Sequence, residues 1–175
     1  MKSNLEVSND LKEAAASSIK PNIEISDVDL RQVATILNTL LADEYLLYTK
    51  TRNAHWNVEG KSFMELHKLF EGQYDALATI IDDIAERVRS LGHFALGSLK
   101  NFLSVTRLLE DMEDFSDSFH IIQTLLDDHE TIIRILRNNI ADLSKESKDF
   151  GSIDFLTGLM EQHEKTAWML RSYLA

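Results

Sequence analysis

The chain of 175 residues contains no cysteine, one proline and six glycines. Without cysteine, neither a disulfide framework nor a thiolate zinc site is available, so any bound metal must use imidazole and carboxylate groups. Because Pro21 is the only proline and glycine is scarce, long helices are possible almost anywhere after position 25. The length is that of one domain, and 44% hydrophobic residues are enough to bury a core.

The sequence also lacks long apolar runs and a surplus of basic residues. No segment approaches the roughly 18 apolar residues of a membrane span, and Met1 to Asp10 lacks the basic-then-apolar profile of a secretory signal. We therefore expect a cytoplasmic protein that does not enter a membrane. A formal net charge of −11 repels nucleic acid and acidic lipid unless a basic patch is segregated on the surface, and the sequence shows no such patch.

The chain divides into a short arm and one helical domain. Residues 1–25 mix Ser, Asn, Ala, Lys and Glu without apolar periodicity, which predicts a mobile N-terminal arm. Residues 26–175 form the domain. In it, apolar residues recur at helical spacing in four long stretches, at about 27–55, 62–91, 117–145 and 152–174.

Cap signals and a long connection define how these helices are joined. Ser26 with Asp29, and Ser62 with Glu65, have the spacing of capping boxes, and Gly92 stands where a helix-ending glycine is expected. The connection 93–116 carries a short apolar segment, Val105 to Met112, which we expect to form a small crossing helix. Two hairpins of long helices joined by one long crossover predict an all-α, ferritin-like four-helix bundle.

The second predicted helix carries an apolar stripe flanked on one side by ionisable residues. The stripe consists of Phe63, Leu66, Phe70, Tyr74, Leu77, Ile81, Ile84 and Val88. The flanking residues are His67, Glu71, Asp82 and Glu86. At about 100° per residue these four share one strip of the helix surface. A solvated surface is the alternative explanation for such a strip.

The four ionisable residues cannot form one site within a single chain. Glu71 and Asp82 lie roughly 16 Å apart along the helix axis, too far for a common metal ion. A two-fold axis crossing the helix near Asp75 to Ala78 would place His67 and Glu71 of one chain opposite Asp82 and Glu86 of the other. Two equivalent sites about 22 Å apart are predicted. A mixed imidazole and carboxylate set suits iron or manganese, with zinc as a competitor.

Three segments carry a specific pattern of residues. The first is Lys50 to Gly60, KTRNAHWNVEG, followed by Phe63 and His67. The second is Asp82 to Arg87, DDIAER, and the third is Gln162 to Ser172, QHEKTAWMLRS. Together these segments resemble the Dps family, the bacterial mini-ferritins, and the third is similar to the family's final helix. The resemblance covers nearly the whole chain from Asp27, and only the arm and the crossover match loosely.

This resemblance implies an inter-subunit ferroxidase centre. His55, His67 and Glu71 of one subunit would form it with Asp82 and Glu86 of the two-fold mate. The family often has Asp at the position of Glu71, so the longer side chain would shift the metal while the ligand chemistry is retained. The residues alone also allow His55 to be a capping or core histidine. The implied reaction is oxidation of Fe2+ to Fe3+ by hydrogen peroxide, or more slowly by O2, with storage of ferric mineral in a dodecameric shell.

The resemblance also implies roles for a tryptophan and for three acidic residues. Trp56, beside the proposed centre, would intercept oxidising equivalents, whereas a core tryptophan is the alternative. In similar shells acidic pores lie near the link into the last helix, where this chain has Glu146, Asp149 and Asp154. A negative funnel there concentrates cations, although carboxylates are also common in surface loops.

Two rival functions and one rival site are weighed against this interpretation. Some relatives coat DNA through lysine-rich arms, but here the lysines Lys2, Lys12 and Lys20 are offset by the acidic residues Glu6, Asp10, Glu13 and Glu24. We expect DNA binding to be weak or absent. The second rival function is that of a metal-free assembly protein. The rival site is the in-bundle di-iron site of ordinary ferritins, which uses paired Glu-x-x-His motifs that this sequence lacks; the spacing of Asp117 and His120 favours capping.

Overall fold

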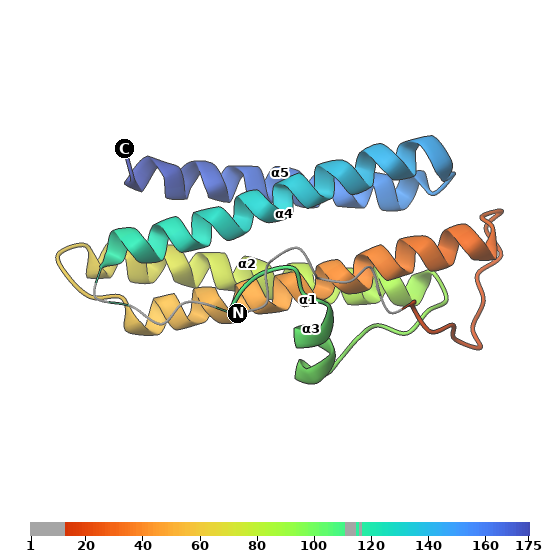
Figure 1. The fold of residues 1–175 in the computed structure, drawn as a ribbon, viewed down its shortest axis with the longest axis horizontal. Coiled ribbons are helices and arrows are strands. Elements are labelled where there is room, and N and C mark those ends of the chain that lie inside the picture. Colours follow the sequence, from red (N-terminus) through yellow and green to blue (C-terminus); the bar gives the residue numbers. More distant parts are fainter. Residues whose placement is uncertain (1–12, 111–114, 116) are drawn as a thin grey trace, which may run out of the picture.

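The computed structural model describes residues 13–110, 115 and 117–175, and in them it contains five helices and no strand. The helices are α1 (Asp27–Asn57), α2 (Phe63–Ser90), α3 (Leu99–Val105), α4 (Ser118–Glu146) and α5 (Phe150–Tyr173). The long helices pair as two antiparallel hairpins, α1 with α2 and α4 with α5, which lie side by side (Figure 1). The predicted four-helix bundle with one long crossover between its hairpins is confirmed.

Only one of the two predicted capping boxes provides a side-chain cap. The Ser26 hydroxyl accepts a hydrogen bond from the backbone N–H of Asp29 at 3.1 Å and so caps α1. Ser62 has φ −95° and ψ 20° rather than an extended backbone, and its hydroxyl makes no cap hydrogen bond. The capping box predicted at Ser62 is therefore wrong, although α2 does begin at the next residue.

The crossover helix lies earlier in the chain than the sequence predicted. It spans Leu99–Val105 instead of following Val105, because Ser98 caps it and Phe102 anchors it. The Ser98 hydroxyl accepts from Asn101 N–H at 3.3 Å, and the Phe102 ring stacks on Tyr45 of α1 at 4.6 Å between centroids. Residues 111–112 of the predicted segment lie outside the described part of the chain.

Buried ion pairs hold the rest of the crossover against the bundle. Arg107 donates two hydrogen bonds to the buried carboxylate of Asp43 on α1. Its guanidinium Nε–H donates to Oδ2 at 2.8 Å, and its backbone N–H donates to Oδ1. Lys50 Nζ of α1 donates to Leu109 O at 2.9 Å and pairs with Asp128 of α4 at 2.6 Å. Burial of Asp43 raises the pKa of its carboxyl, and Arg107 opposes that shift.

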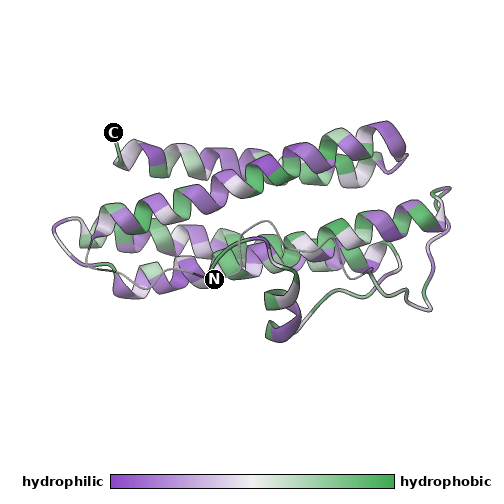
Figure 2. Cartoon of the chain, viewed as in Figure 1, coloured by the Kyte–Doolittle hydropathy of each residue, from purple (hydrophilic) through white to green (hydrophobic). Residues whose placement is uncertain are grey.

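The buried face of α2 is rotated from the predicted stripe. Gln73 and Ile80 are buried, whereas Tyr74 and Ile81, which the sequence assigned to the stripe, are only partly buried. The reason is that α2 packs mainly on α1 but also contacts α5, so its core face lies between these two neighbours. Hydrophobic and hydrophilic residues alternate along all four long helices (Figure 2).

Part of the predicted N-terminal arm contacts the bundle. Ser17 N–H donates to Gly92 O at 2.8 Å, Phe94 N–H donates to Ala15 O at 2.9 Å, and Ala14 joins the hydrophobic core. Residues 1–12 of the predicted arm lie outside the described residues. Over the described ranges, every helix is too short or too polar to cross a membrane.

Candidate metal centre

The turn between α1 and α2 brings two predicted ligands together. His55 lies in the last turn of α1, and His67 lies near the start of α2. Their imidazole rings stack with centroids 3.7 Å apart and planes inclined by 21°. His55 and His67, which a helix break separates in the sequence, therefore form one unit at the turn end of this hairpin.

Reciprocal hydrogen bonds fix how each imidazole is oriented. His55 Nδ1 lies 2.8 Å from His67 O, and His67 Nδ1 lies 2.9 Å from His55 O. A carbonyl oxygen only accepts, so each Nδ1 must carry the proton and donate. The Nε2 atom of each neutral ring then has a free lone pair. Metal-binding histidines typically have this arrangement, with the second ring nitrogen donating to a backbone carbonyl.

Aromatic side chains surround the histidine pair. Tyr74 meets the His55 ring edge-on at 5.2 Å, and the Arg52 guanidinium lies over both Tyr74, at 4.9 Å, and Trp56, at 5.1 Å. Trp56 is 62% exposed, so it is not a core tryptophan. Burial, followed by the charges of nearby carboxylates, raises the pKa of Tyr74, and its phenol keeps its proton at neutral pH.

The predicted carboxylates lie on the exposed surface of α2. Glu71 follows His67 by one turn, whereas Asp82 and Glu86 lie several turns further along the same helix. Among the residues described, no group of three or more His, Asp or Glu side chains is arranged to hold a metal ion within one chain. One chain thus brings together His55 and His67, with Glu71 one turn away, and holds Asp82 and Glu86 apart from them.

The three predicted pore residues differ in their surroundings. Glu146, at the end of α4, and Asp154, in α5, are exposed. Asp149 is only 3% exposed, because its Oδ1 atom caps α5 by accepting from Ser152 N–H at 3.0 Å and pairs with Arg87 Nη2 at 3.0 Å. The carboxylate of Asp149 is therefore engaged in helix capping and in an ion pair within the chain.

Sequence reasoning missed a polar cluster inside the bundle. Glu44, His129 and His163 are buried on α1, α4 and α5, and the side chains are connected by hydrogen bonds. The sequence does hold one sign of this cluster, because each of these polar residues occupies a position of its helix where the apolar pattern predicts a core residue. His129, for example, lies between Leu125 and Ile132 on the buried face of α4.

The helix cap predicted at Asp117 is confirmed. Its carboxylate accepts from Phe119 N–H at 2.9 Å.

Comparison with known proteins assigns the class. Residues 34–175 match the family described as the ferritin-like domain, so the chain is a ferritin-like protein. It is 45% identical over 153 residues to a low temperature-induced protein of Nostoc, covering 87% of this chain and 86% of that protein. It is 33% identical to DNA protection during starvation protein 2 of Bacillus anthracis, covering 82% and 97% of the two chains.

A solved structure narrows the assignment. The Dps protein of Vibrio cholerae, described as a member of a broad superfamily of ferritin-like diiron-carboxylate proteins, superposes with a TM-score of 0.83 at 29% identity. The match covers 91% of this chain and 100% of that chain. Within the ferritin-like class, this chain belongs to the Dps family.

Proposed function

We propose that the chain is the subunit of an iron-oxidising and iron-storing shell whose ferroxidase centres are shared between two-fold-related copies. The observation that carries the proposal is the histidine pair. Both rings donate Nδ1–H to a backbone carbonyl and present Nε2 to a cation. Glu71 supplies a carboxylate one turn away.

The remaining ligands come from a second copy. With α2 antiparallel to its copy and the two-fold axis near Asp75 to Ala78, Asp82 and Glu86 of the partner subunit lie opposite His67 and Glu71. All three carboxylates are exposed in the single chain, as this arrangement requires. The pairing yields two equivalent centres about 22 Å apart.

Exposed apolar side chains next to the histidines support an interface there. Trp56, Phe63 and Met64 are 62%, 38% and 54% exposed in the isolated chain. Apolar side chains gathered at one end of a hairpin are a feature of protein contact surfaces. A copy seated on them would also exclude bulk water from the centre.

The chemistry follows from the ligand set. Mixed imidazole and carboxylate donors bind Fe2+ as a substrate, and Zn2+ or Mn2+ competes for the same donors. Two Fe2+ ions lose one electron each to one hydrogen peroxide, whose O–O bond breaks and which takes up two protons to give two water molecules. O2 serves as a slower oxidant. Trp56 intercepts oxidising equivalents that leave the centre. Ferric mineral then accumulates in a dodecameric shell, which Glu146 and Asp154 help cations to enter.

The name of the Bacillus anthracis relative includes DNA protection, and on that basis DNA coating is a second possible function, which we consider the weaker candidate. Phosphate binding requires unpaired basic groups. Of the arm's lysines, the described Lys20 is already paired with Asp27 at 3.2 Å. The net charge of −11 adds repulsion.

Stopped-flow oxidation of Fe2+ by hydrogen peroxide tests the proposal. His67→Ala removes one ligand and should slow the reaction at least about tenfold, the lower end of losses seen when even the partners of metal ligands are removed. His120→Ala, an exposed histidine on α4, is the matched control and should leave the rate unchanged. Equal rates for His67→Ala and the unmodified protein would contradict the proposed centre.

A further inference from the structure

Each of the four long helices contributes one buried polar side chain to the same region of the bundle. They are Glu44 on α1, Gln73 on α2, His129 on α4 and His163 on α5, all at most 6% exposed. Burying polar groups among leucines and isoleucines costs free energy unless each group finds a partner. The cluster therefore calls for an explanation beyond packing.

Three of these side chains form a chain of hydrogen bonds. His163 Nε2 lies 2.9 Å from Glu44 Oε1, and His163 Nδ1 lies 2.8 Å from His129 Nδ1. Glu44 Oε2, His129 Nε2 and both amide atoms of Gln73 have no hydrogen-bond partner among the described residues. The chain of hydrogen bonds therefore ends at His129, whose Nε2 atom has no hydrogen-bond partner among the described residues.

The proton positions follow from which atoms can donate and which can accept. A carboxylate oxygen accepts, so His163 donates Nε2–H to Glu44, and the remaining Nδ1 lone pair of His163 accepts Nδ1–H from His129. Burial is the main cause that lowers the pKa of His129 well below its usual value, in agreement with a neutral ring. The Nε2 atom of His129 then has a free lone pair, and hydrogen bonds through His163 connect the His129 ring to the carboxylate of Glu44.

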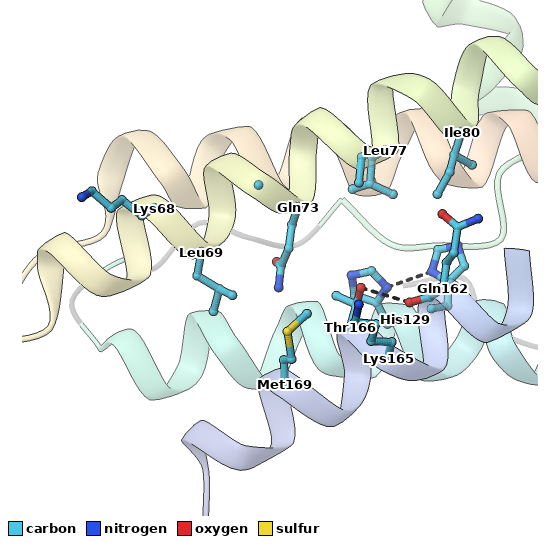
Figure 3. Close-up of a pocket in the computed structure, with 13 residues that line it drawn as sticks. Lys68, Leu69, Gln73, Leu77, Ile80, His129, Gln162, Lys165, Thr166 and Met169 are labelled. Carbon is cyan, nitrogen blue, oxygen red and sulfur yellow. Dashed lines mark hydrogen bonds between the residues drawn. The ribbon is translucent and has the colours of Figure 1, made fainter.

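This lone pair faces a cleft between α2 and α5. The cleft has a volume of about 440 Å³ and is lined by both His129 and Gln73, with Leu69, Leu77, Ile80 and Met169 forming much of the apolar wall. Gln73 reaches into it from α2, while His129 reaches it from α4 on the opposite side (Figure 3). Two unpartnered, buried polar groups on opposite walls thus frame the same space.

We propose that this cleft is a second metal site, separate from the inter-subunit centre, which binds a divalent transition-metal cation through His129 Nε2 and Gln73 Oε1. A cation satisfies the imidazole lone pair and the amide oxygen at once, and it compensates the charge of Glu44. The carboxylate behind the ligand histidine raises its basicity.

The donor set argues for one ion with water completing its coordination. One imidazole and one amide differ from the paired carboxylates of an in-bundle di-iron site. Lys68 and Lys165 lie at the rim, but both are exposed, so solvent and counter-ions screen their charges. Lys68 also extends away from the cleft in Figure 3.

Co2+ binding in the full-length protein tests the site. The starting protein carries His67→Ala and Glu86→Gln, which remove two proposed ligands of the inter-subunit centre. Because every variant is compared in this same background, the result for the cleft does not depend on how that centre is assigned. Adding His129→Leu should lower the calorimetric stoichiometry by one Co2+ per chain, because leucine fills the space without a donor atom. Adding His120→Leu, at an exposed position of the same helix, should leave the stoichiometry unchanged.

A Co2+-soaked crystal of the unmodified protein provides the second measurement. We expect an anomalous peak beside His129 Nε2 and Gln73 Oε1. A cleft holding only water, or His129→Leu protein that binds as much Co2+ as its parent, would overturn the proposal. If His129→Leu does not fold, Gln73→Leu on the opposite wall serves instead, and it should weaken Co2+ binding at least about tenfold; unchanged affinity in that variant would equally overturn the site.

Discussion

At the scale of single residues, helical spacing groups the exposed candidate ligands but does not reveal the polar cluster in the core. His67, Glu71, Asp82 and Glu86 lie on one strip beside the apolar stripe, so helical periodicity alone groups them. The reciprocal bonds between His55 and His67 depend on how the α1–α2 turn folds, and periodicity does not contain that information. The family resemblance, rather than geometry, singled out His55.

The buried cluster shows the opposite limit. Gln73, His129 and His163 occupy positions that a pattern of apolar residues assigns to the core, so a polar residue there is easily taken for a break in the stripe. Only the packing of four helices shows that these breaks coincide in space. That coincidence depends on the rotation of each helix about its axis, which the sequence fixes only approximately.

His129 makes a pH-dependent prediction at this scale. Its pKa is lowered in the folded protein, from an ordinary value of 6.5, mainly by burial. As pH falls below about 6.5, the unfolded chain takes up a proton at His129 that the folded chain does not, so the free energy of unfolding decreases. The contribution reaches at most about 1.4 kcal/mol per pH unit.

Chemical denaturation of chelator-treated protein at several pH values measures this effect. His129→Leu should flatten the pH dependence below 6.5, whereas His120→Leu, whose side chain is exposed, should not. Identical slopes for His129→Leu and the unmodified protein would show that the buried ring is protonated in the folded state after all.

At the scale of elements, helix identity was predictable and helix ends less so. The four long helices and the closing role of Gly92 follow from periodicity and from scarce proline and glycine. The crossover helix was placed too late because Phe102, its one buried residue, gives no repeating pattern in seven residues. Its position depends on long-range contacts, such as the ring of Tyr45, that local sequence does not reveal.

Gly92 carries the sharpest prediction for an element. It ends α2 with φ +81°, and a Cβ atom there would lie 2.7 Å from Pro21 Cδ and 3.0 Å from Ile19 O. Gly92→Ala should therefore destabilise the protein by about 2 kcal/mol or more, through left-handed backbone strain and displacement of the 19–21 segment.

Gly158 in α5 is the matched control, since a Cβ atom there meets nothing within 4 Å. Gly158→Ala should stabilise the helix by up to about 1 kcal/mol. Thermal denaturation of both variants compares them directly. A Gly92→Ala protein as stable as Gly158→Ala would mean that the α2 end relaxes without cost.

At the scale of the whole molecule, the proposed centre exists only in the assembly. The described chain keeps Asp82 and Glu86 several turns from the histidine pair along α2. Fold class and hairpin order can be predicted from one sequence, because short loops join antiparallel neighbours and one long connection marks the crossover between hairpins. We inferred the assembly because Glu71 and Asp82 lie too far apart along one helix to share a metal ion. The periodicity of a single chain does not show how two copies pack against each other.

Complementation between two inactive variants tests sharing of the centre. His67→Ala and Glu86→Gln shells should each be slow, whereas shells co-assembled from both chains should recover about one quarter of the unmodified rate. Random pairing makes half of the two-fold pairs mixed, and each mixed pair has one intact centre out of two. Mixed shells as slow as their parents would indicate a centre contained in one chain.

DNA binding is expected to fail at this scale because the charge of the assembled protein is strongly negative. The net charge is −11 per chain, and each copy adds the same. We expect no electrophoretic mobility shift of duplex DNA at about 0.15 M salt, where phosphate contacts are screened. A robust shift under these conditions would favour the DNA-coating function instead.

Anomalous diffraction from iron-soaked crystals tests the central claim most directly, because it locates the metal and the subunits together. The account predicts iron beside Nε2 of His55 and His67, with Asp82 and Glu86 of the partner subunit completing the ligands. A second equivalent peak should appear about 22 Å away across the two-fold axis. Crystals in which these side chains face open solvent, with no iron between two-fold mates, would contradict it.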